Sequence, residues 1–70
     1  MQIIFTNHAL FRIEKRGILK EEVIDAVKYP DKILKKHGLH YYQKKLNRGV
    51  IEVCCEKTER IINVVTIYWI

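Results

Sequence analysis

The chain contains few of the residues that build covalent cross-links or rigid turns. It has two cysteines, Cys54 and Cys55, one proline and three glycines in 70 residues. Because neighbouring residues of a strand point to opposite faces, the two thiols are poorly placed to form a disulfide with each other. We expect them to pack as small hydrophobic residues, which fits a protein of the reducing cytoplasm.

Long apolar runs and known catalytic motifs are also missing. The uncharged C-terminal stretch, residues 61–70, is about half as long as a membrane-spanning helix. The first residues do not resemble a signal peptide, so we expect no membrane association. Phosphate-binding loops, dinucleotide fingerprints, nucleophile elbows and zinc-ligand spacings are absent, so we predict neither a metal nor a cofactor.

The composition that remains is that of one small folded domain covering residues 1–70. Hydrophobic residues make up 49% of the chain, and no repeat, linker or low-complexity segment divides it. This content is too high for a disordered protein. A chain of this length buries only about 60% of its unfolded surface, so the core is small.

The N-terminal half predicts one strand and two helices. An apolar run over Gln2–Phe5 reads as a strand, and Thr6 or Asn7 can cap the following helix, which Gly17 ends. A second helix is expected over Lys20–Lys28, before Pro30. The short connection between the helices predicts a tight helical hairpin.

The C-terminal half predicts four strands joined by short turns. The runs rich in β-branched and aromatic residues are Lys32–Lys36, Leu39–Leu46, Val50–Lys57 and Arg60–Trp69. The expected fold class is therefore α+β, with the two helices on one face of an antiparallel sheet of three to five strands. Solvent, a partner subunit or a ligand must then meet the other face. The last run is apolar at both odd and even positions, so the sequence does not show which of its side chains face the helices.

The clearest functional pattern is His8, Arg12 and Arg16, spaced by four residues on one helix face. RNA cleavage by the neighbouring 2′-hydroxyl needs an acid, a base and cations that stabilise charge on phosphorus. Histidine titrates near neutral pH, and nearby arginines favour its neutral, basic form. The alternative is a surface histidine beside solvated arginines.

A block of basic residues in the middle of the chain carries the excess positive charge. Residues 31–48 hold six Lys or Arg against one Asp, while the rest of the chain is nearly balanced. Interleaved histidine and tyrosine suit a nucleic acid backbone with exposed bases. The alternative is a solvated surface that keeps the protein soluble. The expected RNA-binding residues are Lys35, Lys36, His40, Tyr42, Lys44, Lys45 and Arg48.

The tyrosines of the strands have two readings each. His40, Tyr42 and Lys44 share one side of their strand and would face a bound RNA, which would place Tyr41 in the core. Tyr68 could orient a phosphate or stack a base if its side faces the open surface. If its side faces the helices, it belongs to the core.

The order of several short motifs resembles a family of small prokaryotic domains of unknown function. These motifs are His8-Ala9 with Arg12, Arg16-Gly17-Ile18, Glu21-Glu22-Val23, Tyr29-Pro30-Asp31 and Val64-Val65-Thr66-Ile67-Tyr68. The layout also resembles the RelE/ParE-like toxin superfamily, whose members include toxins that cleave messenger RNA. The resemblance implies a small α+β domain with His8, Arg12, Arg16, Thr66 and Tyr68 at recurrent polar positions. Leu19 departs from the family's polar residue before the second helix.

The leading hypothesis is a toxin-like endoribonuclease with His8, Arg12, Arg16 and Tyr68 as catalytic residues. It would act on RNA, free or on the ribosome, with an antitoxin protein as partner and a homodimer left open. A module that binds nucleic acid or protein without catalysis is the alternative, and a structural or regulatory subunit is a third reading. A nuclease needs the His8 face and the basic block to lie together, whereas a binding module does not.

Overall fold

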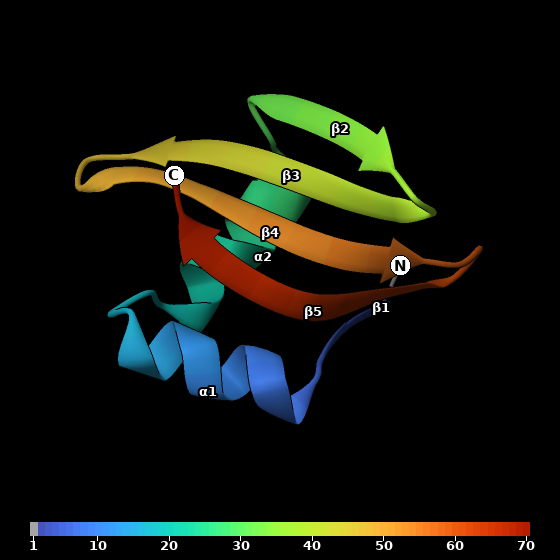
Figure 1. The fold of residues 1–70 in the computed structure, drawn as a ribbon, viewed down its shortest axis with the longest axis horizontal. Helices are drawn as coiled ribbons and strands as arrows, with labels where there is room; N and C mark the ends of the chain where they lie inside the picture. Colours follow the sequence, from blue (N-terminus) through green and yellow to red (C-terminus); the bar gives the residue numbers. More distant parts are fainter. Residues whose placement is uncertain (1) are drawn as a thin grey trace.

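The computed structural model describes residues 2–70 as a five-stranded sheet with two helices. The elements in chain order are β1 (Gln2–Phe5), α1 (Asn7–Lys15), α2 (Lys20–Lys28), β2 (Lys32–Lys36), β3 (Leu39–Leu46), β4 (Gly49–Lys57) and β5 (Ile61–Trp69). Figure 1 shows α2 across one face of β3 and β4, and α1 alongside β5. The expected α+β class is confirmed.

The strand order is β1-β5-β4-β3-β2. Strands β2 to β5 form the expected antiparallel meander. Strand β1 differs because it pairs in parallel with β5, from Gln2 opposite Ile61 to Phe5 opposite Val64. The sheet is therefore mixed. The paired strands come from opposite ends of the chain. The hydropathy pattern of one strand does not show whether a partner so distant in sequence runs parallel or antiparallel to it.

Local signals explain the ends of the helices. The Thr6 hydroxyl accepts a hydrogen bond from the Ala9 N–H at 3.1 Å and caps α1. Gly17, at φ 66°, follows α1 in the left-handed conformation that glycine adopts without strain. Leu19 cannot cap α2 with a side-chain oxygen, and its N–H donates instead to the Glu22 carboxylate at 2.9 Å. This bond caps the first turn of α2.

Two-residue turns join β2 to β3 and β3 to β4, and residues 58–60 join β4 to β5. His37 and Gly38 both have positive φ, 52° and 75°, as a tight hairpin turn requires. At the next turn Leu46 pairs with Gly49, so Asn47 and Arg48 form the loop. A Cβ on Gly49 would lie 3.3 Å from a ring carbon of Trp69. Glycine is needed there because the Trp69 ring covers the backbone.

A β-bulge explains the ambiguous pattern of β5. Cys54 pairs with Thr66 but Cys55 pairs with Val64, so Val65 is an extra residue. Ile62 and Val64 face the helices before the bulge, and Ile67 faces them after it, because the bulge reverses the alternation. Tyr68 therefore points to the face of the sheet that no helix of residues 2–70 covers, which we call the open face.

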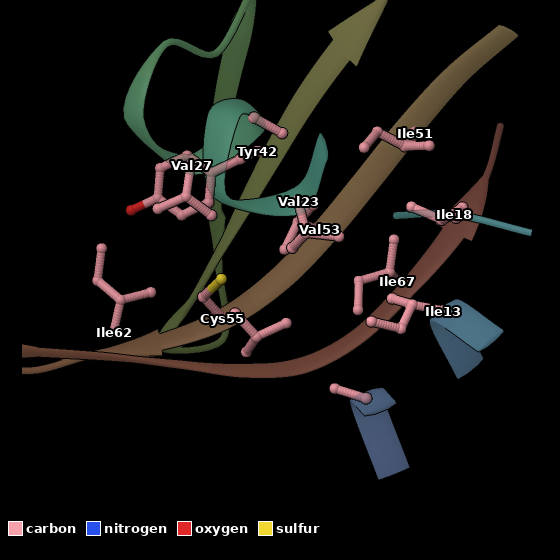
Figure 2. Close-up of a cluster of buried hydrophobic side chains, with 13 residues drawn as sticks. Ile13, Ile18, Val23, Val27, Tyr42, Ile51, Val53, Cys55, Ile62 and Ile67 are labelled. Atoms are coloured by element: carbon pink, nitrogen blue, oxygen red, sulfur yellow. The ribbon is translucent and has the colours of Figure 1, made fainter. Parts of the chain in front are cut away.

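The core lies between the sheet and the helices, as Figure 2 shows. Its fully buried side chains include Val23 of α2, Ile51 and Val53 of β4, and Ile67 of β5. Tyr42 is also part of this core, with 4% of its surface exposed.

The sequence led to one packing expectation for Tyr41 and Tyr42 and another for the two cysteines. Tyr42 faces the helices and Tyr41 the open face, so the expectation for these two rings is wrong. Strand alternation fixes only that they oppose each other, and packing against Val27 and Cys55 in the core decides which is buried. Cys54 and Cys55 are free and buried, and burial raises the pKa of Cys55 to about 12.

Candidate functional site

His8 and Arg12 lie next to each other on the outer surface of α1. The Arg12 Nε donates a hydrogen bond to His8 Nε2 at 3.4 Å. In this arrangement the ring nitrogen Nε2 is the acceptor and the guanidinium is the donor. The expected pairing of a histidine with a cation is therefore present for these two residues.

Arg16 has a different environment from His8 and Arg12. Its Nη1 donates to the main-chain oxygen of Ile67 at 2.6 Å, and its own carbonyl accepts from Trp69 Nε1 at 3.1 Å. The pairing of β1 with β5 stops at Val64, so later carbonyls of that β5 edge need other donors. The Thr6 hydroxyl lies near the oxygens of Val64 and Val65 in the same way. Arg16 thus holds α1 against the edge of β5.

Two residues of the basic block are neutralised by partners within the fold. Lys44 donates to the Tyr29 carbonyl at 2.8 Å and lies 3.9 Å from Asp31. Arg48 makes two hydrogen bonds to Glu22, at 2.8 and 2.9 Å, which lower the pKa of that carboxyl. These contacts tie the strands to α2, and they reduce the charge that Lys44 and Arg48 present to a ligand.

The remaining predicted RNA-binding residues are divided between the two faces of the sheet. Strand alternation places Lys35 and His40 on the helix side, where His40 stacks on the buried Tyr42 ring at 6.1 Å between centroids. Lys36 and Lys45 project from the open face. The structure therefore brings only part of the expected set together.

A row of polar side chains crosses the open face. Gln43, Glu52 and Tyr68 are direct neighbours on β3, β4 and β5. The Gln43 amide donates to one Glu52 oxygen at 2.7 Å, and the Tyr68 hydroxyl donates to the other at 2.5 Å. Burial and the bond to Glu52 raise the pKa of Tyr68 above its ordinary value, so the phenol stays protonated and donates. Of the two readings for Tyr68, the structure supports the open one.

A pocket of about 200 Å³ lies beside this row. Its walls are Leu34 and Lys36 of β2, Tyr41 of β3, Glu52 of β4 and Tyr68 of β5. Burial and nearby Cys54 and Glu52 raise the pKa of Tyr41, so this phenol is also neutral. The pocket combines an aromatic wall, an acceptor and a cation, which are the groups that recognise a planar polar ligand.

Sequence reasoning missed Glu52, Tyr41 and Leu34 as members of this site. The alternation around Glu52 was a usable signal, since Ile51 and Val53 on either side are fully buried and so place Glu52 on the opposite face. The bulge in β5 concealed that Tyr68 would be its neighbour. The described residues include no cluster of three His, Cys, Asp or Glu side chains suited to a metal ion.

The His8–Arg12 pair and the open-face pocket lie in different parts of the molecule. Helix α1 contacts β5 and β1, and its side chains Ala9 and Ile13 enter the core. Strands β5 and β4 separate α1 from β3 and β2, which carry the basic block. The two groups that a nuclease would need are thus separated by these two strands.

The chain can now be placed among known proteins. Residues 5–69 match the family described as Domain of unknown function (DUF4258), so the chain belongs to this family. No curated protein and no solved structure matches it. The matched region contains both α1 and the open face. Among residues 2–70, no helix is long and apolar enough to cross a membrane.

Proposed function

We propose that this protein binds single-stranded RNA through the open face of its sheet. The observation that supports this is the arrangement of Lys32, Lys36 and Lys45 around Tyr41 and Tyr68 on a face without a covering helix. The three lysines form no ion pair with any residue from 2 to 70.

The chemistry of single-stranded RNA matches such a surface. Lysines attract the phosphates and release their counterions, while tyrosine rings offer faces on which bases stack. The net charge of +5 adds a long-range attraction. RNA binding also implies a cytoplasmic protein.

The test is binding of a fluorescent single-stranded RNA followed by anisotropy over a range of salt concentrations. The logarithm of affinity should fall linearly with the logarithm of salt concentration, with a slope near −0.7 for each phosphate contact. Absence of binding at low salt would refute the proposal. A double-stranded RNA of equal length serves as control, since its stacked bases are not available to the tyrosines.

A second candidate function, a toxin-like endoribonuclease, is favoured by the contact between His8 and Arg12. His8 would move protons and Arg12 would stabilise the phosphorane. RNA would have to pass from the open face around the β5 edge to reach them. Arg16, held by the Ile67 carbonyl, would position α1 rather than contact phosphate.

Cleavage of RNA with and without ribosomes tests this candidate. His8→Ala and Arg12→Ala should each lower the rate about a hundredfold or more. Glu14→Ala, on another side of α1, is the matched control and should leave the rate unchanged. Full cleavage by both variants would refute the assignment. RNA binding by the wild-type protein without any cleavage product would favour a binding module without catalysis.

The partners of a toxin would be an antitoxin protein or a second copy of this chain. An antitoxin encoded beside this gene would be a small acidic or DNA-binding protein, and expression of the chain alone would arrest growth. Either partner would compete with RNA if it covered the open face. Size-exclusion chromatography with and without RNA distinguishes these arrangements.

A further inference from the structure

We propose that the open-face pocket binds a guanine base of single-stranded RNA and that Glu52 recognises its Watson–Crick edge. This inference rests on the proposed RNA binding and adds base selectivity to it. The pocket of about 200 Å³ is smaller than the ~300–1,000 Å³ of sites for drug-sized ligands, so it suits one planar ring system.

Glu52 is held in a fixed orientation by the neighbouring strands. Gln43 donates to one of its oxygens and Tyr68 to the other, at 2.7 and 2.5 Å. A carboxylate has about four acceptor positions, so each oxygen keeps capacity for a second hydrogen bond. Glu52 also lines the pocket, which directs this remaining capacity toward a ligand.

The hydrogen-bonding pattern of guanine is the one that complements such a carboxylate. Guanine presents two adjacent donors, N1–H and the N2 amino group, which can pair with the two oxygens of Glu52. Adenine and cytosine place an acceptor beside their amino group, and uracil has its single N3–H between two carbonyls. An ionised carboxylate only accepts hydrogen bonds and so repels those acceptors.

The other residues of the pocket fit the rest of a nucleotide. The rings of Tyr41 and Tyr68 and the Leu34 side chain offer aromatic and apolar surface to the base. Glu52 repels a phosphate, so the phosphate would lie toward the Lys36 ammonium at the rim. The charges thus orient the nucleotide with its base inward.

The experiment compares five pentanucleotides that carry uridine at the flanking positions and G, A, C, U or inosine at the centre. Anisotropy at one fixed low salt concentration gives their affinities for the wild-type protein. The guanine oligonucleotide should bind about tenfold tighter than those with A, C or U. Inosine keeps N1–H but lacks the N2 amino group, so its affinity should be intermediate.

Glu52→Gln should abolish the preference for guanine, because an amide presents one donor group and one acceptor. The matched control is Glu56→Gln on the same strand and face, outside the pocket lining. Both substitutions remove one negative charge, so the electrostatic part of the change in RNA affinity should be similar for the two variants. Only Glu52→Gln should change the ranking of the bases.

The outcomes separate this inference from the proposed function. Equal, salt-dependent affinity for all five oligonucleotides would refute the guanine pocket and leave RNA binding intact. Full guanine preference in Glu52→Gln would refute the role of Glu52. Failure of every oligonucleotide to bind would refute both. The inosine comparison uses the wild-type protein and holds even if a variant does not fold.

Discussion

The two faces of the sheet differ in what their side chains do. The face toward the helices is apolar and closely packed, with Ile51, Val53 and Ile67 fully buried. The open face carries the hydrogen-bonded row of Gln43, Glu52 and Tyr68. Since residues alternate along each strand, the buried core and the proposed binding surface use adjacent positions of the same three strands. A substitution can therefore affect one face with little effect on the other.

The largest effect is expected from Ile67→Ala on the helix-covered face. Removal of this fully buried side chain leaves a cavity and should lower the free energy of unfolding by about 2–5 kcal/mol. Thr66→Ala, the neighbour on the open face, should cost less than about 1 kcal/mol. Urea unfolding monitored by circular dichroism measures both values. Similar losses for the two variants would contradict the division between the faces.

An intermediate effect is expected from removal of the open-face charge. The triple variant Lys32→Ala, Lys36→Ala and Lys45→Ala should weaken RNA binding about tenfold or more at low salt and flatten its salt dependence. Replacement of Lys20, Lys28 and Lys57 by alanine removes the same charge away from the open face. This control should retain most of the affinity. If both variants lose affinity equally, net charge rather than the open face determines binding.

The smallest effect concerns the ion pair of Glu22 with Arg48 on the helix side. Hydrogen bonds from Arg48 and from the Leu19 N–H lower the pKa of Glu22 below 4.5. The pair therefore stabilises the fold above that pH and stops doing so as the pH falls through the lowered value.

Thermal melts between about pH 7 and about pH 3 test this dependence. Glu22→Gln should lower the melting temperature slightly at neutral pH and converge with the wild type in acid. The RNA affinity of Glu22→Gln at neutral pH should rise by no more than the small increase expected from the loss of one negative charge. A constant difference in melting temperature at all pH values would show that Glu22 acts through something other than its charge.

The sequence predicted the elements well because the local signals agree with one another. The second helix, ended before Pro30, has the predicted bounds, and so do the strands Lys32–Lys36 and Leu39–Leu46. The next two strands differ by one residue at their starts, Gly49 and Ile61. What escaped prediction is non-local: the parallel pairing of β1 and the bulge at Val65 depend on partners distant in sequence.

The site was harder to predict for the same reason. The basic residues are close in sequence, but alternation divides them between two faces, and partners far along the chain neutralise some of them. Glu22 is 26 residues from Arg48, and Tyr29 is 15 residues from Lys44. Glu52 and Tyr68 are 16 residues apart and meet only because of strand pairing. Composition indicated a basic surface, whereas its position depends on tertiary structure.

The outer edges of the sheet add a consequence for self-association. An exposed strand edge offers a template on which another chain can add a strand, and proteins block such edges with charge or with covering groups. Thr6 and Arg16 occupy the β5 carbonyls beyond β1. The other edge, β2, carries Lys32, Lys35 and Lys36, which repel a second copy. Lys32 and Lys36, to which we also assign a role in the proposed RNA binding, thus protect against aggregation, and a variant without them should be less soluble as well as weaker in binding.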